Sequence, residues 1–129
     1  MSGRYLLDTN IVIDLFAEEQ NVIAFLEEAQ EVFLPVIVLG EMYFGALRSQ
    51  RVKENIHRLT AFAEQSVVLD CDAKVARRYG EVKNMLRKRG RPIPENDIWI
   101  AAIALENNLT LVSRDDHFLE VDGLKLKAC

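Results

Sequence analysis

The chain has 129 residues, of which 50% are hydrophobic, and its formal net charge is −4. This is the size of one ordinary domain that can bury a core, so we expect a single domain over residues 1–129. No run of residues approaches the roughly 18 apolar residues of a membrane span. Asp8 and Asp14 would interrupt the apolar part of a signal peptide. We therefore expect a cytoplasmic protein that does not bind a membrane.

The charge is unevenly distributed. Residues 74–91 hold eight basic residues and one acid, Glu81, so the remainder of the chain is strongly acidic. Such a segment can bind a polyanion. It can equally be a solvated helix whose basic end is favoured by the helix dipole. Both interpretations stay open for these residues: Lys74, Arg77, Arg78, Lys83, Arg87, Lys88, Arg89 and Arg91.

Apolar periodicity predicts strands that alternate with helices. We expect Asp72 to cap one long helix and Gly90 to end it, and we expect another helix to begin after Pro94. The expected strands are 4–8, 31–35, 66–70 and 110–113, with residues 124–127 as a candidate for a last short one. The expected helices are 9–18, 21–30, 36–50, 51–65, 72–90 and 95–108.

This alternation is typical of βαβ units and a mostly parallel sheet with helices on both faces, a three-layer α/β/α sandwich. Ligands of such sheets bind at the carboxyl ends of the strands. Asp8 and the Ser-Arg-Asp-Asp turn at 113–116 both follow expected strands. The sequence has no glycine-rich phosphate loop of the Walker or dinucleotide type, so a P-loop NTPase or a Rossmann oxidoreductase has no support.

Four acidic residues stand beside apolar runs: Asp8, Glu41, Asp97 and Asp115. A carboxylate in apolar surroundings is costly unless a cation offsets its charge. No Lys or Arg immediately flanks the first three acids, so a divalent ion is the expected counter-charge, and oxygen ligands favour Mg²⁺ or Mn²⁺. Each acid also has a local alternative: Asp8 as a helix N-cap, Asp97 in a first helical turn, Glu41 facing outward, and Asp115 in an Asx turn.

Several neighbours can support such a site. Thr9 or Asn10 beside Asp8, and Ser113 before Asp115, are placed to hydrogen-bond a ligating carboxylate or a metal-bound water. Asp115 is followed directly by Asp116, and either of the two could face the metal; we expect Asp115. The two histidines, His57 and His117, are expected at the surface, and the aromatic residues Tyr43, Tyr79 and Trp99 are expected to be core or half-buried.

The segments LLDTNIVID, VLGEMYFGAL, RPIPENDIWIAAIAL and LTLVSRDDHF, in this order, resemble a PIN domain of the VapC toxin type over essentially the whole chain. The resemblance implies a Mg²⁺-dependent ribonuclease with Asp8, Glu41, Asp97 and Asp115 as catalytic residues. Asp8, Asp97 and Asp115 would hold the metal, and Glu41 would bind it directly or through water. In place of the family's preferred threonine, this chain has Ser113, which keeps the hydroxyl.

The resemblance also implies partners. We expect an RNA substrate, a VapB-like antitoxin whose C-terminal segment lies across the acidic groove, and a homodimer. The end of the basic segment, Arg87, Lys88, Arg89 and Arg91, would bind the RNA backbone. The apolar residues available for the protein surfaces are Val22, Phe25, Leu26, Tyr43, Phe44 and Leu47, which can equally be core.

Two alternatives come from other functional classes. A PIN fold without activity could serve as an RNA or protein adaptor, but an adaptor has no need of four clustered acids. A phospho-receiver domain also has a parallel sheet with an acidic Mg²⁺ pocket. It requires a second acid beside the first-strand aspartate, a phospho-accepting aspartate after the middle strand and a late lysine, an arrangement that this chain lacks.

Overall fold

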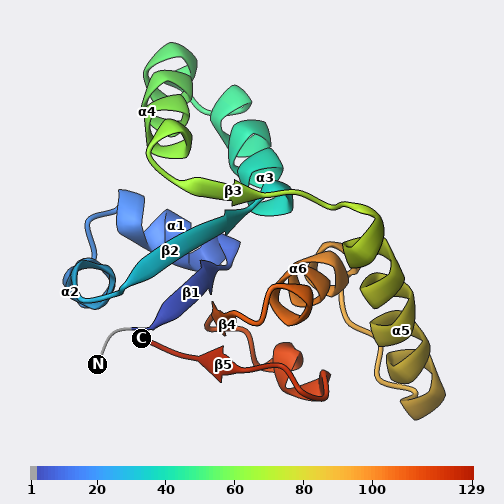
Figure 1. The fold of residues 1–129 in the computed structure, drawn as a ribbon. Helices are drawn as coiled ribbons and strands as arrows, with labels where there is room; N and C mark the ends of the chain where they lie inside the picture. The colour runs from blue at the N-terminus through green and yellow to red at the C-terminus, as the bar shows by residue number, and fades with distance from the viewer. Residues whose placement is uncertain (1–2) are drawn as a thin grey trace.

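A computed structural model describes residues 3–129. It shows a five-stranded sheet surrounded by helices (Figure 1). The elements in chain order are β1 (Arg4–Leu7), α1 (Thr9–Phe16), α2 (Gln20–Glu27), β2 (Glu31–Pro35), α3 (Val36–Leu47), α4 (Val52–Glu64), β3 (Val67–Leu69), α5 (Ala73–Arg89), α6 (Glu95–Glu106), β4 (Thr110–Val112), the 3₁₀ helix η1 (Asp116–Glu120) and β5 (Leu126–Lys127).

All strand pairs in the sheet are parallel, and the strand order is β3-β2-β1-β4-β5. The predicted α/β sandwich with a parallel sheet is therefore confirmed, including its short last strand. The central strand β1 pairs with β2 on one side and with β4 on the other. The chain builds one half of the sheet first and then returns past β1 to build the other. This change of direction lies between β1 and β4.

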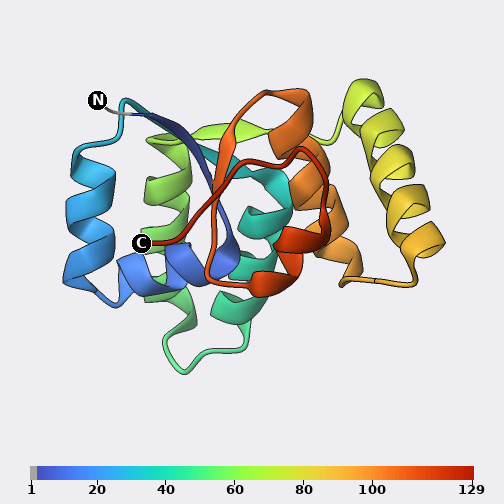
Figure 2. The same cartoon turned by 90° about the horizontal axis from the view of Figure 1, so that it is seen from below.

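The core lies where β1, β4 and α6 meet. Leu6, Leu7, Leu111 and Val112 are all fully buried, and so is the middle of α6, residues 100–104. A helix whose middle is apolar on all sides must be covered there on every side, and α5 packs along α6 (Figures 1 and 2). Within residues 3–129, none of the helices has the length and apolar character needed to cross a membrane.

Local signals set the helix ends as expected. The Asp72 side chain accepts a 2.9 Å hydrogen bond from the Val75 amide at the start of α5. Gly90 ends α5 in the left-handed region, with φ at 65°, which glycine adopts without strain. The helix predicted over 36–50 ends earlier, at Leu47, where Arg48 and Ser49 amides bond back to the last turn.

The apolar residues proposed for protein surfaces separate into two groups. Val22 is fully buried, and Phe25 and Leu26 pack against the core. By contrast, the side chains of Phe44 and Leu47 on α3 are 64% and 63% exposed. The half-buried positions predicted for Tyr43, Tyr79 and Trp99 are confirmed, and the last two rings stack with centroids 4.0 Å apart.

Candidate active site

The candidate site lies at the carboxyl ends of β1 and β4. Leu7 and Val112 are partners in the parallel register, and the Asp8 amide donates to the Val112 carbonyl over 3.0 Å. Asp8 leaves β1 at this point, and Ser113 and Asp115 leave β4 beside it. The loops that follow β1 and β4 turn to opposite faces of the sheet at this switch point, and a crevice forms between them.

Two helices complete the crevice. Glu41 projects from α3, and Asp97 lies in the first turn of α6 after Pro94. The resulting pocket has a volume of about 620 Å³. It is lined by Asp8, Thr9, Asn10, Ile13, Glu41, Pro94, Glu95, Asn96, Asp97, Asp115 and His117. Thus the four acids chosen from the sequence share one pocket, which Asp115 lines and Asp116 does not. No Lys or Arg of the described chain lines it.

Asp8 is the most buried acid of the site, with 3% of its surface exposed. The Ser113 hydroxyl donates a 2.6 Å hydrogen bond to Asp8 Oδ2, and the Thr9 amide donates to Oδ1 over 2.8 Å. Asp8 is therefore both the N-cap of α1 and a member of the site. Burial raises its pKa above the ordinary range. These hydrogen bonds oppose the rise, and the neighbouring Asp97 and Asp115 charges add to it.

Asp97 is half-buried and has a partner that the sequence did not suggest. The Nε2 atom of His117 lies 2.5 Å from Asp97 Oδ2, where the imidazole donates to the carboxylate. Burial raises the pKa of Asp97, the contact with His117 lowers it, and the charges of Asp115 and Glu41 raise it. One oxygen of Asp97, one oxygen of Asp115 and one His117 ring nitrogen lie within 4.8 Å of one another.

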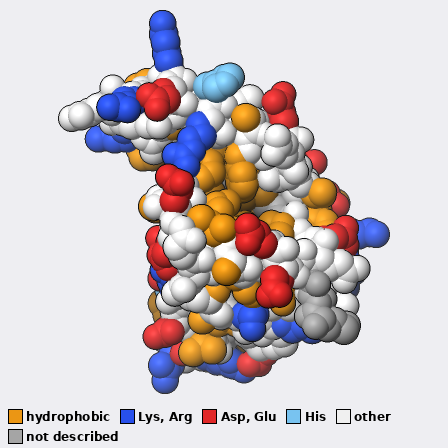
Figure 3. Space-filling model, turned by 90° about the vertical axis from the view of Figure 1, so that its left-hand side faces the viewer, with side chains coloured by type: hydrophobic (Ala, Val, Ile, Leu, Met, Phe, Trp, Pro, Cys, Tyr) orange, Lys and Arg blue, Asp and Glu red, His pale blue; other side chains and the backbone are white. Residues whose placement is uncertain are grey.

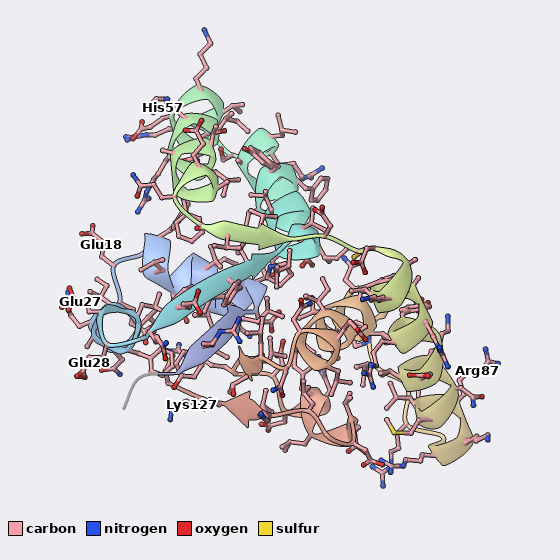
Figure 4. The ribbon with its side chains drawn as sticks, viewed as in Figure 1. Glu18, Glu27, Glu28, His57, Arg87 and Lys127 are labelled. Atoms are coloured by element: carbon pink, nitrogen blue, oxygen red, sulfur yellow. The ribbon has the colours of Figure 1, made fainter. Side chains whose placement is uncertain are left out.

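The prediction that His117 is a surface residue is therefore wrong, whereas His57 is exposed on α4 as predicted (Figure 4). The turn after Asp115 is the 3₁₀ helix η1, which the sequence pattern does not predict. Its Phe118 is fully buried and anchors the turn, so the preceding His117 faces Asp97. The apolar pair Phe118-Leu119 after a run of polar residues is the available signal.

The remaining polar residues hold the acids in place. Thr9 Oγ1 donates a 2.7 Å hydrogen bond to Glu41 Oε1. Asn10 Nδ2 lies 3.5 Å from Asp8 Oδ2 and 3.4 Å from Asp115 Oδ2, so one amide contacts both acids. The other end of this amide, Oδ1, is buried and has no hydrogen-bond partner among the described residues. The supporting positions expected for Thr9, Asn10 and Ser113 agree with these contacts.

The donor set suits a hard divalent cation. Asp8, Glu41, Asp97 and Asp115 all line the pocket, oxygens of Asp97 and Asp115 lie within 4.8 Å of each other, and no described Lys or Arg of the pocket neutralises them. Carboxylates this close raise one another's pKa, so a cation would relieve their repulsion. The unpaired, buried Asn10 Oδ1 adds an oxygen that also suits Mg²⁺ or Mn²⁺ or a water bound to one.

The basic residues predicted to bind RNA lie at the end of α5 and just beyond it, outside this pocket. Arg89 is ion-paired with Asp122, and Arg91 Nη1 lies 3.9 Å from Glu120 Oε2. Arg87 and Lys88 form no ion pair within residues 3–129. The predicted group of four cations is therefore divided by the structure.

Comparisons with known proteins agree with this geometry. The family model described as the PIN domain matches residues 5–124. Ribonuclease VapC2 of Haemophilus influenzae is 37% identical over 114 residues, which cover 87% of this chain and 86% of the relative. The structure of VapBC2 from Rickettsia felis bound to a promoter DNA fragment has a TM-score of 0.90 at 28% identity, with 98% of each chain covered. The structure of VapBC-1 from nontypeable Haemophilus influenzae has a TM-score of 0.89 at 31% identity, with 97% of each covered.

Proposed function

Because this chain belongs to the PIN domain family and is of the VapC type, we propose that it is a metal-dependent endoribonuclease, formed by one PIN domain, that acts as the toxin of a VapBC pair. The observation that carries the proposal is the convergence of Asp8, Glu41, Asp97 and Asp115 in one pocket that no described Lys or Arg neutralises. An inactive adaptor would have no use for such a costly cluster. All four acids that the resemblance assigns to the catalytic site are present in this pocket.

Asp8, Asp97 and Asp115 would hold Mg²⁺ or Mn²⁺, which lowers the pKa of a bound water and stabilises charge on a phosphate. Ser113 and the Thr9 amide hold the Asp8 carboxylate toward the pocket. Thr9 also orients Glu41, which would bind the metal directly or through a water. These hydrogen bonds fix the carboxylates before substrate arrives, as metal catalysis requires.

Water is the nucleophile in this proposal. Thr9 is the one hydroxyl residue among the described residues of the pocket, and it donates to Glu41 rather than to a histidine base. The oxygen of water bonds to phosphorus, the bond from phosphorus to the 3′ oxygen breaks, and that oxygen takes up a proton. The products carry a 5′-phosphate and a 3′-hydroxyl, and the ribose 2′-hydroxyl is not consumed.

A second pocket supports binding of a VapB-like antitoxin. It has a volume of about 290 Å³, lies between α1, α3 and α4, and shares Thr9, Ile13 and Glu41 with the acidic pocket. Ile13 is 52% exposed there. Hydrophobic side chains also gather in a hollow beside the part of the molecule formed by α4 (Figure 3). A partner segment with apolar side chains would fit this pocket and lead directly onto the acids.

The test is cleavage of total RNA by the purified protein with Mg²⁺ or Mn²⁺, with EDTA and Asp97→Asn as controls. We expect discrete cuts that require metal, carry 5′-phosphates and are absent from the variant. Asp116→Asn is the matched control, because Asp116 does not line the pocket. A folded, partner-free protein that binds metal and cuts none of the RNA would contradict the proposal and favour an adaptor.

A further inference from the structure

A third pocket adjoins the acidic one. It lies between the end of α5, the connector that follows and the start of α6, and its volume is about 380 Å³. Ligand pockets of this kind measure about 300–1,000 Å³. Glu95 lines both pockets, so a chain that leaves the acidic site across Glu95 enters this one. The lining residues are Lys83, Leu86, Arg87, Gly90, Pro92, Ile93, Glu95 and Ile98.

We call this third pocket the connector pocket, and its inner wall is apolar. Leu86, Ile93 and Ile98 are each at least nine-tenths buried and belong to the core, while Pro92 is exposed at the rim. Gly90 has open space where a side chain would begin, which keeps the mouth of the pocket wide. An apolar wall beside an exposed proline ring can cover one face of a nucleobase by apolar contact, which is non-directional.

The charges at the rim of the connector pocket suit a phosphate on one side. Lys83 Nζ is held by Glu95 Oε1 at 3.1 Å and by the Tyr79 hydroxyl at 3.2 Å, so its charge is balanced. Arg87 also lines the rim but forms no ion pair within residues 3–129, and its side chain extends from α5 into solvent (Figure 4). Its guanidinium is thus the positive charge available to a ligand.

We infer that the connector pocket binds one nucleotide of the RNA substrate beside the bond that is cut, an inference that rests on the proposed function. The base packs against Pro92 and Ile93, and Arg87 pairs with a phosphate of the same strand. Arg89 and Arg91 do not share this role, because they tie the end of α5 to Asp122 and Glu120. The acidic pocket then cuts the strand, and the connector pocket positions it.

The experiment compares Arg87→Ala with Lys53→Ala. Both residues are exposed on helices, Arg87 on α5 and Lys53 on α4, and both lack an ion pair within residues 3–129. Only Arg87 lines the pocket. Each variant removes one charge and introduces a good helix former. Binding is measured with a fluorescent single-stranded RNA that contains a mapped cut site, in the Asp97→Asn background, at several salt concentrations. Cleavage is measured with each substitution in the otherwise wild-type chain.

We expect Arg87→Ala to raise the Kd and the KM about tenfold, as for loss of one charge-assisted contact, and to reduce the salt slope by about 0.7. The Lys53→Ala variant should stay within about twofold of its parent, as for a solvated charge. Removing single bases from the RNA should identify one position beside the cut where an abasic site weakens binding. Equal effects of the two variants, or no such position, would overturn the inference while wild-type cleavage leaves the proposed function standing. If the wild-type protein cuts no RNA, both proposals fail.

Discussion

His117 on η1 and Asp97 on α6 meet across the pocket, with the imidazole Nε2 2.5 Å from the carboxylate Oδ2. They are 20 residues apart in the chain. The contact fixes the orientation of Asp97 and leaves its other oxygen for a cation. Partners of this type are typical of metal sites, where a hydrogen bond to a ligating carboxylate sets its direction.

His117→Ala should therefore weaken metal binding without unfolding the protein. Loss of such a partner lowers metal affinity or activity by about 10–100-fold. We expect the Mg²⁺ concentration for half-maximal thermal stabilisation to rise by at least about tenfold on this scale. His117→Gln keeps a hydrogen-bond donor, so its half-maximal Mg²⁺ concentration should lie between those of wild type and His117→Ala. A His117→Ala midpoint equal to that of the exposed His57→Ala control would show that His117 does not orient Asp97.

Ser113→Ala should destabilise the fold through Asp8. The Ser113 hydroxyl donates to the buried Asp8 carboxylate and accepts from the Asp115 amide. Removing a partner from a buried charged group costs about 1–3 kcal/mol, so unfolding in urea should shift to lower concentration. Ser113→Thr keeps the hydroxyl and should stay near wild type. Ser66→Ala removes a local hydroxyl bond to Phe62 and is the control. An equal loss in both alanine variants would contradict the role of Ser113.

The metal-free protein should lose stability as pH rises through the mildly acidic range. Burial raises the pKa of Asp8 and of Asp97. The folded state then binds protons more tightly than the unfolded state, so the stabilising contribution is complete below the ordinary value of 3.8 and disappears as pH rises through the raised values.

This pH dependence is measured as Tm from pH 4 upward, by about half-unit steps, in EDTA and in Mg²⁺. In EDTA, Asp8→Asn should reduce the decrease of Tm with rising pH, because the variant has no carboxyl to deprotonate at that position. Mg²⁺ should reduce the same decrease of Tm in wild type, because the metal offsets the negative charge that forms as the carboxyl groups lose their protons. The control is Asp116→Asn, outside the pocket. If Tm depends on pH equally in Asp8→Asn and Asp116→Asn, Asp8 is not the source of the pH dependence.

The exposed face of α3 is expected to form the homodimer. Phe44 and Leu47 are 64% and 63% exposed, and apolar side chains this exposed are typical of interfaces. Phe44→Ser and Leu47→Ser together should raise the dimer dissociation constant by about 100-fold or more, since each truncation removes about 1.5 kcal/mol or more of burial. Sedimentation equilibrium measures it. Leu119→Ser on η1, where Leu119 is 70% exposed, is the control and should leave association unchanged. A double variant that still associates like wild type would place the dimer surface elsewhere.

The sequence alone determined the elements and their class. Apolar runs bounded by Pro35, Asp72, Gly90 and Pro94 predicted the strands and helices, because caps, breakers and periodicity act within a few residues of the chain. Alternation of strands and helices then required a parallel sheet. The four acids also stood out, since a charge inside an apolar run is costly wherever the chain folds.

Only the tertiary structure decided which acid faces the pocket and what holds it there. Asp115 and Asp116 have the same side chain and adjacent positions, and the choice between them depends on how the buried Phe118 anchors η1. The same anchor turns His117 toward Asp97. Arg89 is ion-paired and Arg87 has no ion pair among the described residues, and this division likewise depends on where the C-terminal segment passes α5. These outcomes follow from contacts between residues far apart in the chain, which local propensity does not encode.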